Sequence, residues 1–178
     1  MIILVTGGAR SGKSSFAENL YKNENDVVYI ATSKIFDKEM ENRVEAHRKQ
    51  RPITWRTFEA NYNLDKAVEK EDFYLLDCIT LLSSNIMYDI TKDLEDIDFS
   101  TQEKVEKRIT NELDKLINKI RRENKNLILV TNELGMSIVP ENKLARIYRD
   151  IQGRINQKVA KESDQVYLVV CGLPVRVK

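Results

Sequence analysis

Cysteine is scarce in this sequence: its 178 residues include only two, Cys78 and Cys171. Neither belongs to a CxxC pair or to a Cys/His cluster, which excludes a disulfide framework and a zinc site of the usual spacing. Each lies beside a run of apolar residues, so we expect both to be small buried side chains. The three prolines and six glycines are also too few for a collagen-like or linker-rich chain.

Long hydrophobic runs and an excess of charge are missing as well. No apolar run approaches the roughly 20 residues of a membrane span. The N-terminal MIILV is too short for a signal peptide and has no positively charged leader before it. The 29 basic and 28 acidic residues leave a formal charge of +1, unlike the strongly basic domains that hold long nucleic acid. We therefore expect a cytoplasmic protein with no membrane span and no nucleic-acid partner.

Short apolar runs recur along the chain and predict buried strands. They lie at residues 2–6, 27–31, 73–78, 127–131 and 166–171, and residues 54–58 are a further candidate strand. The helical patterns between them cover residues 13–22, the charged stretch 37–49, and two amphipathic stretches at 105–120 and 144–159. Apolar strands that alternate with helices predict a single α/β domain over residues 1–178, with a mostly parallel central sheet covered by helices on both faces.

Two features fit this pattern less well. The acidic stretch 89–100 has no periodicity, and we expect an exposed loop there. Gly153 falls inside the second amphipathic helix, where glycine costs about 1 kcal/mol relative to alanine. A close packing contact is the expected reason for it.

The run GGARSGKS matches the pattern G-x-x-x-x-G-K-[ST] and lies between a predicted strand and a predicted helix. Its residues are Gly7, Gly8, Ala9, Arg10, Ser11, Gly12, Lys13 and Ser14. The glycines let backbone N–H groups converge on a phosphate, and the helix N-terminus adds partial positive charge. Lys13 supplies a charge for the β- and γ-phosphates, and the Ser14 hydroxyl can bind Mg²⁺. The motif predicts a nucleotide site in a RecA-like P-loop NTPase fold.

A P-loop needs a second anchor for its metal, and Asp77 follows the apolar run FYLL. A carboxylate at the carboxyl end of a buried strand can reach Mg²⁺ or its water. The alternative is an aspartate that caps Thr80 or the next helix. Glu133 follows the strand at 127–131 in the same way, and it is either a second carboxylate of the site or a solvated loop residue.

The only histidine, His47, lies in the polar stretch EAHRKQRP. Taken alone, a histidine late in a polar helix is solvated or interacts favourably with the helix C-terminus. The three cationic residues within four positions, Arg48, Lys49 and Arg51, could hold a phosphate beside the ring. A neutral imidazole nitrogen is also a good nucleophile toward phosphorus near pH 7.

The whole chain resembles the bifunctional adenosylcobinamide kinase/adenosylcobinamide-phosphate guanylyltransferases of cobalamin biosynthesis. The resemblance rests on ordered blocks that cover most of the chain. They are GGARSGKS, YIATS, DKEMENRVEAHRKQRPITW, LLDCIT, the run from Val130 to Ala160, and the ending GLPVRVK. Ser137 departs from the pattern, because a second glycine often stands there after Gly135.

The resemblance implies roles for individual residues. His47 matches the histidine that carries a covalent guanylyl group, and Lys13 is the P-loop lysine. Asp77 matches the strand-end carboxylate of the family's nucleotide site, and Ser14 and Asp77 remain the expected groups for Mg²⁺. The implied nucleotide contacts are residues 7–14 together with Ala31, Thr32, Ser33, Arg48, Lys49, Gln50, Arg51, Glu59 and Asp77.

The activity that the resemblance implies has two steps. ATP or GTP phosphorylates adenosylcobinamide, and GTP then donates GMP to that phosphate, which gives adenosyl-GDP-cobinamide and pyrophosphate. The resemblance also implies a homo-oligomer, a trimer. Three other functions remain open from the residues alone: a P-loop kinase with an inert His47, a recombinase-like nucleic-acid motor, and a GTP-dependent switch without transfer chemistry.

Overall fold

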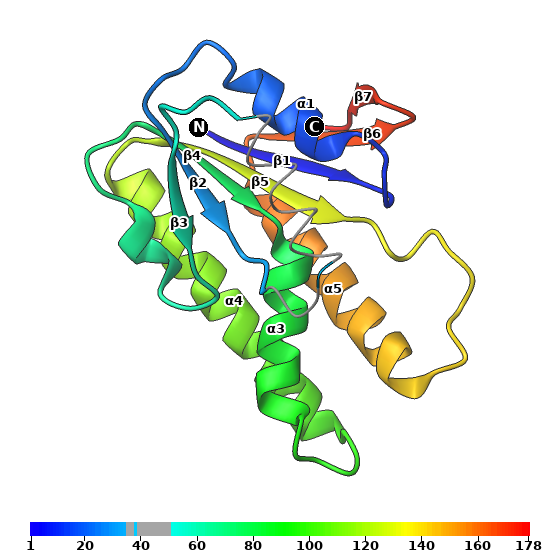
Figure 1. Ribbon diagram of the computed structural model, residues 1–178. Coiled ribbons are helices and arrows are strands. Elements are labelled where there is room, and N and C mark those ends of the chain that lie inside the picture. Colours follow the sequence, from blue (N-terminus) through cyan, green and yellow to red (C-terminus); the bar gives the residue numbers. More distant parts are fainter. Residues whose placement is uncertain (35–37, 39–50) are drawn as a thin grey trace.

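The computed structural model describes residues 1–34, 38 and 51–178, and its centre is one seven-stranded sheet (Figure 1). The strand order is β3-β2-β4-β5-β1-β6-β7. The strands are β1 (Ile2–Gly7), β2 (Val27–Ala31), β3 (Arg56–Glu59), β4 (Phe73–Asp77), β5 (Asn126–Asn132), β6 (Gln165–Val170) and β7 (Leu173–Arg176). All neighbours pair in parallel except β7, which runs antiparallel to β6 at one edge.

Helices cover both faces of the sheet (Figure 1). They are α1 (Lys13–Leu20), the 3₁₀ turn η1 (Leu64–Ala67), α3 (Ile79–Thr91), α4 (Phe99–Arg122) and α5 (Lys143–Glu162). Successive strand residues point to opposite faces, so each strand contributes to two cores. Ile3 and Val5 pack in the α1 core, whereas Ile2 and Leu4 pack with α3, α4 and α5. The predicted fold class is confirmed.

The two long amphipathic helices are confirmed, and both extend beyond their apolar stripes. The side chain of Asp98 begins α4 by accepting a hydrogen bond from the N–H of Thr101 at 2.8 Å. Asn142 caps α5 in the same way through the N–H of Ala145 at 3.0 Å. Such caps satisfy N–H groups that have no partner inside the helix. Among the described residues, no helix is both long and apolar enough to cross a bilayer.

The structure corrects two expectations about local structure. The stretch 89–100 is not a loop throughout, because α3 continues to Thr91 and α4 begins at Phe99. The sequence does not give bounds for the helix after Asp77, because α3 has no clear amphipathic pattern: seven of its 13 residues are buried, and it lacks a charged face. Cys78 is buried as expected, but Cys171 is exposed because it lies in the turn between β6 and β7.

The packing contact expected at Gly153 is absent. A Cβ placed there would meet no atom of the described residues within 4 Å. We therefore expect Gly153→Ala to stabilise the protein by about 1 kcal/mol, because alanine has the higher helix propensity. The melting temperature would rise by about 2–4 °C for a chain of this size. A lower melting temperature would show that the position is packed in solution.

Candidate active site

The P-loop connects the end of β1 at Gly7 to the start of α1 at Lys13. Arg10 and Gly12 have φ values of 59° and 91°, so the loop turns through the left-handed region twice. Gly12 is the N-cap and has no side chain to cap α1, which leaves the first N–H groups of the helix for an anion. The Lys13 ammonium lies over this loop and donates to the carbonyl oxygen of Gly8 at 3.0 Å. The local geometry is that of a phosphate cradle.

The turn between β6 and β7 supports the P-loop from the far end of the chain. The N–H of Gly172 donates to the carbonyl oxygen of Ser11 at 2.8 Å. A Cβ on Gly12 would lie 3.1 Å from the Cα of Gly172, and a Cβ on Gly7 would lie 2.5 Å from the carbonyl oxygen of Val169. These close approaches require glycine in the loop. Sequence reasoning missed this contact because nothing near Gly172 signals which segment it touches.

Gly172→Ala is expected to weaken nucleotide binding. Its φ of 81° costs a non-glycine residue about 1–2 kcal/mol, so the turn would shift. That shift would weaken the hydrogen bond from the N–H of residue 172 to the carbonyl oxygen of Ser11. Calorimetry should show an affinity for GTP reduced by about tenfold. Gly153→Ala is the matched control and should keep the wild-type affinity. Unchanged GTP binding in Gly172→Ala would show that the turn does not support the loop.

Three predicted site residues meet at the carboxyl ends of neighbouring strands. Ala31 on β2 pairs with Asp77 on β4 and with Glu59 on β3. On the other side, Gly7 of the P-loop pairs with Asn132 at the end of β5. Ligands of open α/β sheets bind at this edge of the strands. The topology thus brings the P-loop and these three residues to one edge.

Thr32 has a role that the sequence does not reveal. It is fully buried, and its hydroxyl donates to the carbonyl oxygen of Cys78 at 2.8 Å and accepts from the N–H of Cys78 at 2.9 Å. The amide of Asn85 donates to the carbonyl oxygen of Thr32 at 2.8 Å. Thr32 therefore fastens the end of β2 to the start of α3, and Ser33 beside it is only half-buried.

Asp77 belongs to a group of charged and aromatic side chains next to α1. The Tyr29 hydroxyl donates to Oδ2 of Asp77 at 3.1 Å. The Arg51 guanidinium lies 3.5 Å from the centre of the Tyr29 ring, and its Nε is 3.8 Å from Oε1 of Glu18. Burial raises the pKa of Glu18 to about 7; Arg51 opposes this shift and the charge of Asp77 adds to it. Sequence reasoning selected Asp77 and Arg51 but missed Tyr29 and Glu18.

His47, Arg48, Lys49 and Gln50 lie outside the described residues, and so does most of the helix predicted at residues 37–49. Their predicted roles remain predictions. Arg51 and the turn from Pro52 to Trp55 follow directly in the described part. Trp55 is buried, and its indole N–H donates to the carbonyl oxygen of Glu24 at 2.9 Å.

Glu133 lies beside the P-loop, since its N–H donates to the carbonyl oxygen of Gly7 at 3.0 Å. Its Oε1 accepts from the N–H of Gly135 at 2.6 Å and closes a local turn.

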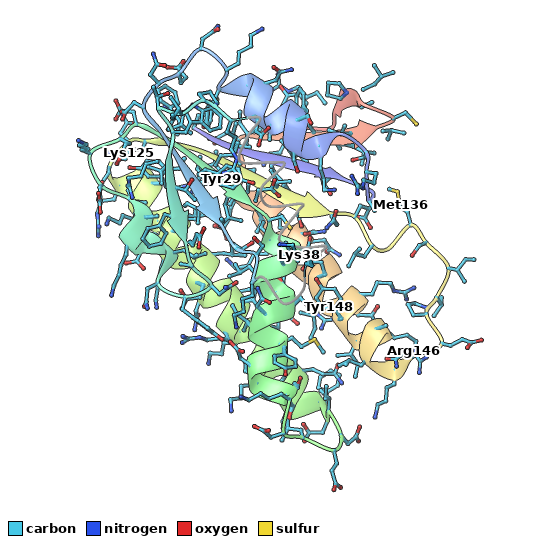
Figure 2. All side chains as sticks on the ribbon, viewed as in Figure 1. Tyr29, Lys38, Lys125, Met136, Arg146 and Tyr148 are labelled. Atoms are coloured by element: carbon cyan, nitrogen blue, oxygen red, sulfur yellow. The ribbon has the colours of Figure 1, made fainter. Side chains whose placement is uncertain are left out.

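Three arginines of α5 that could have reached a phosphate have intramolecular partners instead. Nε of Arg154 lies 2.7 Å from Oε2 of Glu106, and Arg149 and Arg146 are paired likewise with Asp150 and the carbonyl oxygen of Pro140. Arg146 lies near the start of α5 (Figure 2).

The residues present fit a metal that is bound together with a nucleotide. Within the described part of the chain, no cluster of three His, Cys, Asp or Glu side chains could hold a metal ion by itself. Mg²⁺ commonly uses one or two protein groups and takes its other ligands from phosphates and water. Ser14 at the start of α1 and Asp77 at the end of β4 could be those two groups.

Comparison with a solved structure supports the fold. An ATPase from the type III secretion system of pathogenic bacteria superposes with a TM-score of 0.57 at 10% sequence identity. The superposition covers 94% of this chain and 51% of that one, so the chain spans about half the length of the ATPase. At this identity the likeness concerns the fold alone.

Comparisons of sequence identify the family. The chain is 45% identical to the bifunctional adenosylcobalamin biosynthesis protein CobU of Escherichia coli over 182 residues, with 100% of both chains covered. It is 34% identical to the bifunctional adenosylcobalamin biosynthesis protein CobP of Pseudomonas aeruginosa, over 98% of this chain and 96% of that one. The family model described as cobinamide kinase / cobinamide phosphate guanyltransferase matches residues 3–177. The chain therefore belongs to the CobU family of cobinamide kinases and cobinamide phosphate guanylyltransferases.

Proposed function

We propose that this enzyme works through a guanylyl-histidine at His47, and that one P-loop serves both of its steps. Family membership makes the chain a bifunctional cobinamide kinase and guanylyltransferase of adenosylcobalamin biosynthesis. The observation that carries the proposal is the P-loop at the carboxyl edge of the sheet, with Lys13 over the loop and Asp77 two strands away from β1. The substrates are adenosylcobinamide and its phosphate.

In the kinase step, the hydroxyl of the aminopropanol arm of adenosylcobinamide attacks the γ-phosphorus of ATP or GTP. The new P–O bond forms as the bond to the departing nucleoside diphosphate breaks, and the hydroxyl proton passes to solvent. Lys13 and the N–H groups of residues 8–14 bind the β- and γ-phosphates. Ser14 and Asp77 would hold Mg²⁺, which would supply positive charge to the phosphate oxygens. The protein contributes chiefly position and charge.

In the guanylyl step, a ring nitrogen of His47 attacks the α-phosphorus of GTP. A P–N bond forms, the P–O bond to the β-phosphate breaks, and pyrophosphate leaves. An oxygen of adenosylcobinamide phosphate then attacks the same phosphorus, and the P–N bond breaks. The covalent intermediate replaces one difficult displacement by two easier ones. We assign nucleotide contacts to Ala31, Ser33, Glu59 and residues 48–51, with Thr32 contributing through the loop that it holds.

The test of the proposed function is a timed reaction of the purified protein with adenosylcobinamide, GTP and Mg²⁺, analysed by liquid chromatography and mass spectrometry. Adenosylcobinamide phosphate should appear first, followed by adenosyl-GDP-cobinamide and one equivalent of pyrophosphate. ATP in place of GTP should support the first product only. Accumulation of the phosphate with GTP and no second product would reduce the proposal to a kinase. Sedimentation of the same sample tests the predicted trimer.

A further inference from the structure

Asp77 accepts a hydrogen bond from Tyr29, a side chain that the proposed mechanism does not use. Tyr29 and Leu75 pack in the core on the α1 face, and Asp77 lies two residues after Leu75, so it points to the same face. The Tyr29 side chain is on β2 (Figure 2), and the residue is only 5% exposed. Its hydroxyl donates to Oδ2 of Asp77 across the strand pair at 3.1 Å.

A second layer holds the Tyr29 ring. The Arg51 guanidinium covers the ring at 3.5 Å from its centre, and the Arg51 side chain is 8% exposed. Glu18 on α1 lies next to Arg51, with 3.8 Å between Oε1 and Nε. Oε1 of Glu18 is buried and has no hydrogen-bond partner among the described residues. Its interaction with Arg51 is therefore electrostatic, and a buried charge of this kind is costly without such a partner.

The chemistry of this arrangement suits a support for a metal ligand. The Tyr29 hydroxyl is the donor in this pair and the Asp77 carboxylate is the acceptor, so the hydrogen bond holds one oxygen of the carboxylate in place. A cation over an aromatic ring attracts its electron density, which strengthens the hydroxyl as a donor. Groups that hydrogen-bond to a ligating carboxylate fix its orientation, and their loss commonly costs 10–100-fold in metal affinity.

We propose that Tyr29 is a positioning residue for Asp77, and that Arg51 and Glu18 hold the Tyr29 ring in place. Because Tyr29 binds Oδ2, Oδ1 would be the oxygen that Asp77 offers to Mg²⁺. This inference rests on the proposed role of Asp77. It assigns a function to Tyr29 and Glu18, to which the proposed mechanism gives no substrate contact.

The test is the Mg²⁺ dependence of GDP binding, measured by calorimetry over a range of Mg²⁺ concentrations. Tyr29→Phe keeps the ring under Arg51 and removes only the donor to Asp77. We expect the Mg²⁺ concentration for half-maximal affinity to rise by about tenfold. The affinity for GDP at saturating Mg²⁺ should stay near that of the wild type.

Tyr74→Phe is the matched control. Tyr74 is fully buried on β4, and its hydroxyl donates to the carbonyl oxygen of Glu71 at 2.7 Å, near the opposite end of the strand from Asp77. Both variants lose one buried hydroxyl, so a purely structural effect would lower the two melting temperatures alike. Only Tyr29→Phe should change the Mg²⁺ requirement.

A second pair of variants tests whether Glu18 and Arg51 hold the Tyr29 ring in place. Glu18→Gln should raise the Mg²⁺ requirement in the same direction but by less, because it acts through Arg51 and the ring. Glu71→Gln is its control, since Glu71 is buried and pairs with Arg56 at 2.6 Å away from the P-loop. That variant should lose stability and keep the Mg²⁺ requirement of the wild type.

Asp77→Ala separates failure of the inference from failure of the proposed function. If Asp77→Ala binds GDP with the wild-type Mg²⁺ dependence, Asp77 is not the metal carboxylate, and both the assignment and this inference are wrong. If Asp77→Ala loses that dependence while Tyr29→Phe keeps it unchanged, only the inference is wrong. A lower Mg²⁺ requirement in Tyr29→Phe would mean that the tyrosine competes with the metal, which would also overturn it.

Discussion

Replacing His47 with asparagine is expected to abolish the covalent guanylyl adduct and leave the kinase step intact. Wild-type protein incubated with GTP and Mg²⁺ should gain the mass of one guanylyl group, and acid should remove it, because a P–N bond to imidazole is acid-labile. Loss of an enzyme's nucleophile typically costs about 10⁴-fold or more in turnover. Transfer of GMP to adenosylcobinamide phosphate should fall by that order, as measured by release of pyrophosphate.

The kinase step is the internal control for this variant, because its attack on the γ-phosphorus does not involve His47. Formation of adenosylcobinamide phosphate by His47→Asn should equal that of the wild type, which shows that the protein is folded and binds nucleotide. An adduct of wild-type size on His47→Asn would contradict the assignment. Absence of any adduct on the wild type, with the second product still formed, would favour direct transfer without a covalent intermediate.

Replacing Lys13 with alanine is expected to reduce both activities together. The ammonium lies over the P-loop, where it donates to the Gly8 carbonyl oxygen, and it is nearly buried there. A bound triphosphate offers it a negatively charged partner whose charge grows as the phosphoryl or pyrophosphate group departs. Removing one such preorganised group costs about 10²–10³-fold in rate. Steady-state assays of the two products should show both losses.

Lys22→Ala is the matched control for Lys13→Ala, since Lys22 is exposed and follows the C-cap of α1. It removes the same charge from the opposite end of α1 and should retain both activities. Equal melting temperatures of the two variants would assign the loss in Lys13→Ala to phosphate binding. A loss confined to one of the two products would contradict a single P-loop that serves both steps.

The sequence predicted those parts of the molecule whose signals are local. The P-loop is eight consecutive residues between a strand and a helix, so its chemistry and its place in the fold can be read together. Six of the seven strands were predicted, five of them because they are runs of mostly apolar residues; the sixth, β3, is an edge strand with alternating polar residues. The extent of α3 and the strand β7 were not predicted, because α3 has no charged face and every residue of β7 is exposed.

Other parts of the site depend on which segments the tertiary structure brings together. The Tyr29 hydroxyl meets Asp77 because β2 and β4 are neighbours although 48 positions separate the two residues. The N–H of Gly172 meets the carbonyl oxygen of Ser11 because β6 lies beside β1. A tyrosine inside an apolar strand and a glycine in a turn look the same whether or not they support a site. The sequence by itself determined the nucleotide-binding chemistry, which consecutive residues carry, whereas strand order alone decided which side chains hold that chemistry in place.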